Sequence, residues 1–298
     1  MKTRKAVLAA GILLLFVCTN AQIESLKNRI ENVLEIKNAT IGIAIIANEG
    51  RDTLTVNGNS HFPMQSVFKF PIALAVLSEV DKGTFSLDQK ITFTKEELIK
   101  PTWSPIGDKY PDGGSLTIAQ LLEYTVSQSD NNGCDILLKL IGGPEVAENF
   151  LKAHGFTDIS IKINERIMHQ GWDEQFKNWS TPAEMTDLLM YAYRNKNHLL
   201  SEESYNFIWK VMRETATGMK RLRGQLPADT IVAHKTGTSG TNDEGITAAC
   251  NDAGVILLPD GNPIYISVFV SNSAEDTGTN EKIISDIAKL VWDYYIGN

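Results

Sequence analysis

The sequence predicts an α+β fold, in which a five-stranded antiparallel sheet from both chain ends is flanked by terminal helices and joined to an all-α lobe. Three observations predict this α/β sandwich with a helical insertion. Strand-like patterns lie near the two ends, over 40–56 and 230–270. The chain between 81 and 210 is mostly helical in pattern, with Gly and Pro as punctuation. Amphipathic patterns predict helices over 23–37 and 281–294.

The first third of the chain predicts a helix, a hairpin and a buried helix. Residues 40–47 are rich in isoleucine and predict a strand, which the turn at 48–52 connects to a second strand at 53–56. From 67 to 77 almost every side chain is apolar, so this helix belongs inside the domain. The first helix has its apolar residues at helical spacing: Ile23, Leu26, Ile30, Val33 and Leu34.

The middle of the chain predicts further helices over 116–124 and 133–140, the second ending at Gly142-Gly143. Thr181-Pro182 has the pattern of an N-cap followed by proline at the first helical position, and predicts a helix to Tyr193. The stretch 163–180 is polar, aromatic and poorly periodic, and predicts a loop.

Strands return late in the chain. Residues 230–233 predict a strand that runs into Lys235-Thr236-Gly237. Two more strands, 253–258 and 264–270, flank Pro259-Asp260-Gly261-Asn262, which is a strong hairpin signal.

The N-terminus has the pattern of a secretory signal. A basic start (Lys2, Arg4, Lys5) precedes an apolar run from 6 to 17 that is too short to span a membrane comfortably, and we expect cleavage after Ala21. Lipid attachment at Cys18 is the alternative, although bulky residues precede it. We therefore expect an exported, periplasmic protein with no stable membrane association unless Cys18 carries a lipid.

Composition predicts one mature domain, 22–298, with a sheet lobe (22–61 and 211–298) and a helical lobe (62–210). Loss of the signal would change the formal net charge from −8 to −11, so binding to nucleic acid is not expected. The two remaining cysteines could pair or be buried free thiols. The five histidines are scattered without a zinc motif, so we expect no metal and no cofactor, and a monomer.

Candidate catalytic residues begin with Ser66 and Lys69, which interrupt the apolar helix near its start. Three residues apart on a helix, their side chains lie on one face within reach of each other. A serine beside a lysine at a helix N-terminus is a candidate activated nucleophile. By itself, a serine three residues before a lysine is common by chance, and Pro71 is tolerable only in the first helical turn.

Three further features strengthen this hypothesis. Ser129-Asp130-Asn131 opens a helix, Lys235-Thr236-Gly237 follows a strand, and Glu165 lies in the loop between them. Each alone has an ordinary explanation as a helix cap, a strand-end turn or a solvated carboxylate. Because the three features follow Ser66 and Lys69 in this order along the chain, chance does not explain them well.

With these motifs the chain resembles the class A serine β-lactamases, whose fold is shared with the DD-peptidases. The resemblance covers essentially the whole mature chain. It is strongest to the VEB-like and PER-like extended-spectrum branch, and three segments carry that closer match: Pro63-Met64-Gln65-Ser66, Lys235-Thr236-Gly237-Thr238 and Gln175-Phe176-Lys177-Asn178-Trp179.

The resemblance implies hydrolysis of penicillins and cephalosporins, with resistance to these antibiotics as the consequence. Ser66 would form an acyl-enzyme, with Lys69 as a candidate acceptor of its proton. Ser129 would relay a proton to the ring nitrogen, and Glu165 would activate the hydrolytic water. The family does not settle whether Lys69 or Glu165 is the acylation base.

The resemblance also implies how a small β-lactam substrate is bound. Asn131 would meet the side-chain amide, while Lys235 and Thr236 would meet the carboxylate. The backbone of Thr238, with that of Ser66, would form an oxyanion hole. Arg221 would supply a second cation, unless it is a solvated surface residue. Trp103 would line the entrance, unless it is a core residue.

Two departures from the family pattern concern the loop around Glu165. His169 stands where an asparagine normally helps to hold the water, and the arginine–aspartate pair that usually fastens this loop is replaced by Ile163 and Asn178. The PER-like branch shares both features, which predicts a differently built loop. Gln65 replaces the cysteine of the carbapenem-hydrolysing branch, so strong carbapenem turnover is not expected.

Two alternative functions share most of this chemistry. A DD-peptidase or penicillin-binding protein would use Ser66 and Lys69 but lacks a deacylating glutamate, so Glu165 argues against it. A β-lactam sensor would be acylated without turnover, but such a domain is normally tethered to a transmembrane receptor.

Overall fold

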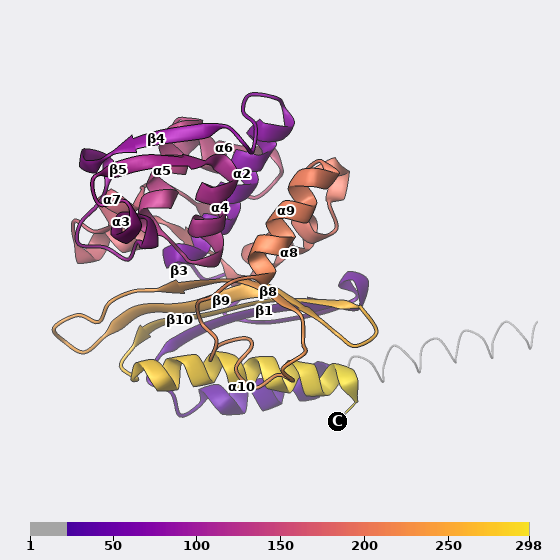
Figure 1. Ribbon diagram of the computed structural model, residues 1–298. Coiled ribbons are helices and arrows are strands. Elements are labelled where there is room, and N and C mark those ends of the chain that lie inside the picture. Colours follow the sequence, from indigo (N-terminus) through magenta and orange to yellow (C-terminus); the bar gives the residue numbers. More distant parts are fainter. Residues whose placement is uncertain (1–22, 298) are drawn as a thin grey trace, which may run out of the picture.

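The computed structural model describes residues 23–297, and it builds its main sheet from both ends of that range. The five strands are all antiparallel, in the order β2-β1-β10-β9-β8 (Figure 1). The predicted five-stranded sheet is therefore confirmed. Its strands are β1 (Thr40–Ala47), β2 (Asp52–Val56), β8 (Val232–Thr238), β9 (Thr247–Leu257) and β10 (Pro263–Ser273).

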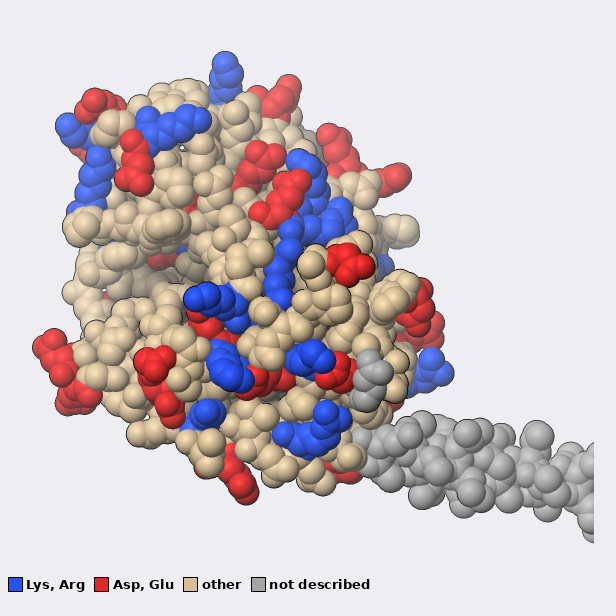
Figure 2. All heavy atoms as spheres, turned by 60° about the horizontal axis from the view of Figure 1, so that its bottom comes forward, with Lys and Arg blue, Asp and Glu red and all other residues tan. Residues whose placement is uncertain are grey.

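Two helices cover one face of this sheet, and their apolar sides form one of the two cores. Residues 23–34 form the first helix, and α10 spans Thr277–Ile296. Leu26 and Ile30 from the first helix join Ile284 and Val291 of α10 against inward-facing strand residues. On the outer face of this layer, charges of both signs are interspersed (Figure 2), in part as ion pairs one turn apart along α10.

The opposite face of the sheet carries the remaining helices (Figure 1). Helix α8 (Pro182–Tyr193) packs on β1 and β10, and α9 (Glu202–Arg213) packs on β8. Thr181 caps α8 and Pro182 is its first residue, as predicted. The other elements above the sheet include α2 (Lys69–Asp81), α3 (Pro105–Lys109), α4 (Ile118–Ser127), α5 (Asn131–Ile141), α6 (Pro144–Ala153) and α7 (Glu165–Met168).

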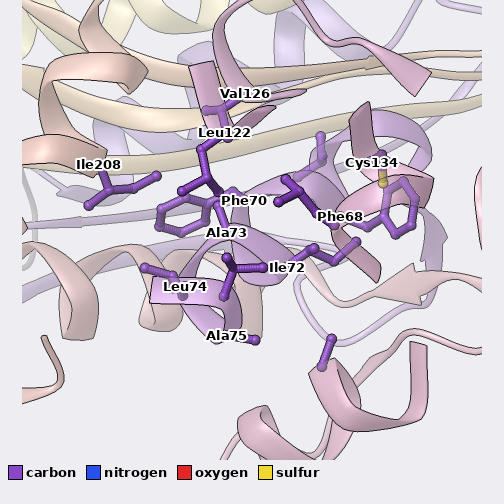
Figure 3. Packing of buried hydrophobic residues seen from close by; sticks show 14 of the residues in the cluster. Phe68, Phe70, Ile72, Ala73, Leu74, Ala75, Leu122, Val126, Cys134 and Ile208 are labelled. Carbon is purple, nitrogen blue, oxygen red and sulfur yellow. The ribbon is translucent and has the colours of Figure 1, made fainter. Parts of the chain in front are cut away.

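Helix α2 lies at the centre of this second core. It is apolar all round, and Figure 3 shows its side chains pointing outward in several directions, among residues of α4, α5 and α9. A 3-10 turn, η2 (Gln65–Phe68), leads into it, and Pro71 is the third residue of α2. Proline is tolerated there because the first-turn N–H groups have no partner within the helix. The predicted buried helix is confirmed, and Ser66 lies in the turn that precedes it.

The helical region differs from the prediction in two places. It contains a short hairpin, β4 (Lys90–Thr94) and β5 (Gly113–Thr117), which the sequence analysis missed. The helix predicted from Leu116 begins only at Ile118, because Leu116 is paired in β5 and Thr117 caps α4. Apolar residues in this short alternating stretch suit a strand as well as a helix, so periodicity alone could not assign them.

A second small sheet fastens the segment that carries Glu165. It has the order β3-β7-β6, with strands Phe62–Pro63, Trp179–Ser180 and Ile159–Ser160. The predicted loop at 163–180 thus contains α7, a 3-10 helix η4 (Trp172–Lys177) and β7. The end of the segment, β7, therefore pairs with the strand that enters the Ser66 turn, and β6, just before the segment, pairs with β7 on its other side.

Cys134 and Cys250 are both buried free thiols, which settles the alternative left open by the sequence. Burial raises the pKa of the Cys134 thiol well above its ordinary value. From residue 23 to residue 297, no helix is long and apolar enough to cross a membrane. The expected signal segment and Cys18 lie outside the described residues.

Candidate active site

Lys69 connects the predicted nucleophile to the other site residues. Its side chain is fully buried, and its Nζ lies 2.7 Å from the Ser66 Oγ. Nζ also lies 3.1 Å from the Ser129 carbonyl oxygen, 2.5 Å from the Asn131 Oδ1 and 2.7 Å from the Glu165 Oε1. An ammonium group has three protons, so it cannot donate fully to four neighbours at once. Movement of one proton from Lys69 to Glu165 would leave a lone pair for the Ser66 hydroxyl.

Ser129 lies between the two lysines: its carbonyl oxygen contacts Lys69 and its hydroxyl contacts Lys235. Its left-handed backbone (φ 60°) precedes α5, whose N-cap Asp130 accepts a hydrogen bond from the Gly133 N–H. Lys235 Nζ donates to the Ser129 Oγ over 2.8 Å and to the Thr236 carbonyl over 2.9 Å. Burial and then the charge of Lys69 hold the pKa of Lys235 well below its ordinary value. Such a lysine can share a proton with Ser129.

The strand that carries Lys235 passes very close to the nucleophile turn. The sequence analysis placed Lys235-Thr236-Gly237 after a strand at 230–233. The structure corrects this, because the motif lies within β8. A Cβ at Gly237 would lie 2.3 Å from the Met64 carbonyl oxygen, which only glycine avoids. Asn251 on β9 donates to the Pro63 carbonyl over 2.8 Å and locks the turn to the sheet. This contact brings Thr238 and Ser66 to the same cavity.

Glu165 is the first residue of α7, and its carboxylate faces the cavity. Asn164 caps this helix, and the Asp135 carboxylate accepts the N–H groups of Glu165 (2.7 Å) and Arg166 (3.0 Å). Lys69 approaches Glu165 Oε1 at a poor hydrogen-bonding angle, and among the described residues this oxygen accepts no hydrogen bond. The oxygen is buried against Lys69, so the contact between them is an ion pair.

Burial raises the pKa of Asp135 to about 6. An unfolded aspartate has a pKa near ~3.9, so between the two values the folded protein holds a proton that the unfolded chain has lost. Raising the pH through this window should therefore destabilise the wild type relative to Asp135→Asn, by about 2 kcal/mol. Urea unfolding of both proteins at pH 4 and pH 7 measures this, and a constant difference would contradict it.

Asn178 fastens the Glu165 segment in place of the family's missing ion pair. Its fully buried amide accepts the N–H groups of Lys162 (2.8 Å) and Ile163 (3.0 Å), and it donates to the Ile163 carbonyl over 2.8 Å. The Asn178 carbonyl in turn accepts the Met64 N–H over 2.9 Å. A neutral amide thus holds this segment where the family pattern has an ion pair, which agrees with the predicted difference in how the loop is built.

Replacing Asn178 with alanine should strip three backbone groups of their partners, two of them on the buried residue Ile163. Each loss costs on the order of 1 kcal/mol, so we expect the free energy of unfolding to fall by about 3 kcal/mol. Asn178→Asp keeps the two accepted bonds and loses the donated one, so its free energy of unfolding should fall by a smaller amount. Urea denaturation compares the three proteins, and equal stability of all of them would contradict the fastening role.

His169 follows α7 and bridges the Glu165 segment to the opposite wall. Its Nδ1 lies 2.7 Å from the Glu165 carbonyl, and its Nε2 lies 3.0 Å from the Thr102 Oγ1. Thr102 Oγ1 also accepts from Asn131 Nδ2 over 2.7 Å. His169 therefore joins two sides of the cavity through its two ring nitrogens.

The structure decides between the alternatives left open for Arg221 and Trp103: the first is buried and the second is exposed. Arg221 is buried, so its reading as a solvated residue was wrong, and its guanidinium donates to the Gly237 and Asn251 carbonyls and to the Thr238 Oγ1. Trp103 is 62% exposed, so its reading as a core residue was wrong. Both line a cavity of about 230 Å³ beside Ser66.

A larger cavity of about 600 Å³ opens on the other side of Ser66, between the Glu165 segment and the end of β8. Together the two cavities are lined by Ser66, Ser129, Asn131, Glu165, Thr236 and Thr238. Lys69 and Lys235 are buried behind them. The described residues hold no cluster of His, Cys, Asp or Glu suited to a metal ion. The predicted site residues are thus brought together around Ser66.

The sequence analysis missed three polar residues that support the site. Asp135 holds the Glu165 N–H, Thr102 links Asn131 to His169, and Gln175 accepts a hydrogen bond from Gln65 over 2.7 Å. Asp135 lies one turn after Asn131 on α5, and this spacing was the only available signal. Thr102 and Gln175 lie in irregular segments, where spacing does not predict contacts.

Comparison with known proteins identifies the family. The model of the β-lactamase enzyme family matches residues 25–295. The chain is 59% identical to β-lactamase VEB-1 of Pseudomonas aeruginosa (99% of each chain). It is 41% identical to the extended-spectrum β-lactamase PER-1 of the same organism (97% of this chain, 95% of the relative).

Solved structures agree. TLA-1 extended-spectrum β-lactamase is 50% identical with a TM-score of 0.89 (92% of this chain, 99% of that one). A β-lactamase from Chitinophaga pinensis is 48% identical with a TM-score of 0.88 (92% and 100%). A family match over nearly the whole described range, together with this fold and this cluster around a serine, leaves one conclusion: the chain belongs to the β-lactamase enzyme family, as a class A serine β-lactamase.

Proposed function

We propose that this enzyme hydrolyses the β-lactam ring of penicillins and cephalosporins through an acyl-enzyme on Ser66, and so confers resistance to them. One observation carries the mechanism: the Lys69 ammonium contacts both the Ser66 hydroxyl and the Glu165 carboxylate. A nucleophile, a proton acceptor and a base for water thus meet at one buried atom.

In acylation, the Ser66 Oγ attacks the lactam carbonyl while its proton passes to Lys69, which is freed for this by donating a proton to Glu165. The new Oγ–C bond forms as the C–N bond of the ring breaks. Ser129 gives its hydroxyl proton to the ring nitrogen and recovers one from Lys235, 2.8 Å away. The N–H groups of Ser66 and Thr238 stabilise the oxyanion, whose charge develops only in the transition state.

After acylation, Glu165 returns its proton to Lys69, and the extra proton of Lys69 passes through Ser129 to Lys235, which had given one up. In deacylation, the restored Glu165 carboxylate takes a proton from water, and the water oxygen attacks the ester carbonyl. The ester C–Oγ bond then breaks, and the Ser66 Oγ recovers a proton. The position of Glu165 supports this role, since it lines the cavity beside Ser66. A DD-peptidase has no such group, which is why we favour hydrolysis over transpeptidation or sensing.

Each of the two cavities would bind a different part of the substrate. The smaller one, with Arg221, Thr236 and Thr238 in its walls, suits the carboxylate. The larger one, beside Asn131 and the Glu165 segment, has room for a bulky acylamino side chain. The relative PER-1 is named an extended-spectrum β-lactamase, and we propose the same range for this enzyme.

We also propose that residues 1–21 direct export to the periplasm, where residues 22–298 act as a monomeric domain of a sheet lobe and a helical lobe. Mass spectrometry of the mature protein from a periplasmic extract tests this. An N-terminus at Gln22 is the expected result, and a lipid-modified Cys18 would contradict it.

The experiment that tests the function is turnover of a penicillin and a cephalosporin by the purified mature protein, followed by absorbance. We expect many turnovers per enzyme molecule. Stoichiometric acylation that stops after one event would support a sensor or a penicillin-binding protein instead.

A further inference from the structure

Behind β8, three side chains from separate segments form a buried relay that the mechanism above does not use. His234 and Asp252 are both fully buried, on β8 and β9. His234 Nδ1 lies 2.9 Å from each carboxylate oxygen of Asp252, and Arg223 Nε donates to the His234 Nε2 over 3.2 Å. Since side chains alternate along a strand, His234 points to the opposite face from its neighbour Lys235.

The chemistry of the three groups fixes the proton on His234. A guanidinium only donates, so the His234 Nε2 that faces Arg223 must be an acceptor. The ring proton then lies on Nδ1, directed at the Asp252 carboxylate. The relay therefore runs from a carboxylate through a neutral imidazole to a guanidinium. It is fully hydrogen-bonded, which makes it rigid in a buried setting.

The relay anchors the segment 214–231, which joins α9 to β8. Arg223 also donates to the carbonyls of Arg213, at the end of α9, and Val232, at the start of β8. Thr215 Oγ1 donates to the His234 carbonyl over 2.6 Å, and the Leu222 N–H donates to Asp252 over 3.2 Å. Both ends of the segment are thus held by the relay residues.

The part of this segment between the anchors forms one wall of the smaller cavity. Thr217, Gly218 and Arg221, which we call the carboxylate wall, line it beside Thr236. Thr217 Oγ1 and Thr236 Oγ1 are 2.6 Å apart, so the wall and β8 share a hydrogen bond. A wall held only by surface loop contacts would move with the loop, whereas this one is pinned to the interior of the sheet.

Asp252 also contributes charge at this place. Lys235 and Arg221 are buried close together, and a fixed carboxylate behind the strand helps to offset their positive charges. The negative charge of Asp252 acts to raise the pKa of Lys235, against the lowering caused by burial and by Lys69. A cationic Lys235 is the form that attracts a substrate carboxylate.

We propose that Asp252, His234 and Arg223 are positioning residues for substrate recognition, and that they hold the carboxylate wall and Lys235 in the geometry that binds the substrate carboxylate. The inference rests on the proposed function, because it concerns the anionic group of the same substrates. None of the three residues touches the substrate, so their effect passes through the wall.

The test compares a penicillin carrying a free carboxylate with its methyl ester, using wild type, His234→Phe and Arg223→Met. The relay predicts that kcat/KM for the acid falls on the order of tenfold in both variants, mainly through KM, while that for the ester changes little. Arg223 is only half-buried, so its variant should fold even if His234→Phe does not. Asp293→Asn on α10, which removes an ion pair with Lys289 far from the cavity, is the control and should alter neither value.

A proportional loss for acid and ester would overturn the proposal, because it would indicate a purely structural role. The ring tautomer gives a second readout that does not need turnover. In a ¹⁵N-labelled protein, the signal lost in His234→Phe should show a protonated Nδ1 and an unprotonated Nε2, and the reverse would overturn the relay. If wild type hydrolyses neither substrate, the proposed function fails, while the tautomer still decides whether the relay exists.

Discussion

Glu165→Ala is expected to stop the enzyme after a single acylation. The variant keeps Ser66 and Lys69, so the lactam still opens, more slowly because Lys69 has lost the carboxylate that accepts its proton, but no base remains to take the proton of the attacking water. Loss of a general base lowers a rate by about 10² to 10⁴, and we expect kcat to fall by about 10³. Mass spectrometry after mixing with a penicillin should show a stable adduct of one intact substrate mass on Ser66.

The control for this variant is Glu174→Ala, which removes a partly exposed carboxylate from the same segment whose partner is the surface residue Lys177. It should turn over like wild type. If Glu165→Ala deacylates as fast as wild type, the role given to Glu165 is wrong and the water is activated elsewhere. If no adduct forms at all, Glu165 is also needed for acylation, and the proton transfer through Lys69 gains support.

Lys69→Met is expected to lose acylation itself. Methionine fills a similar buried volume but leaves Ser66 without a proton acceptor, so the acylation rate should fall by about 10³ to 10⁴. It also leaves the Glu165 carboxylate buried without its cation, which costs about 3 to 5 kcal/mol of stability. Burst kinetics measure the first effect, and urea unfolding measures the second.

A double variant separates these two effects. Lys69→Met with Glu165→Gln removes the unpaired charge together with its partner, so most of the stability should return while acylation remains lost. Lys82→Met, at the exposed end of α2, breaks an ion pair with Glu79 on the surface and should leave both measurements near wild type. Rapid acylation by Lys69→Met would exclude Lys69 as the proton acceptor for Ser66.

The fold was largely predictable because its elements carry strong local signals. The isoleucine-rich strand at β1, the hairpin between β9 and β10, and the proline-capped start of α8 each follow from residue type and spacing. The β4–β5 hairpin was not, since its strands are short and only partly buried. Local pattern cannot show which short segments find a partner.

The catalytic cluster was predictable for a different reason. Ser66, Ser129 and Lys235 belong to motifs whose order along the chain resembles that of a known family. What holds Glu165 could not be predicted, because the carboxylate of Asp135 and the amide of Asn178 act on backbone groups far along the chain. Such contacts depend on the packed backbone, and the position of Asp135 one turn after Asn131 is the only trace of them in the sequence.

The pairing of β1 with β10 has a consequence for how the enzyme is made. Thr40 faces Ser271 and Ile46 faces Tyr265, so the central strands of the sheet come from opposite ends of the described chain. During synthesis, β1 therefore cannot pair with β10 until the end of the chain has been made. Long-range pairing of this kind slows folding, and it also delays the arrival of Lys235 beside Ser129. A nascent chain that stops short of β10 would therefore carry the nucleophile but no assembled site.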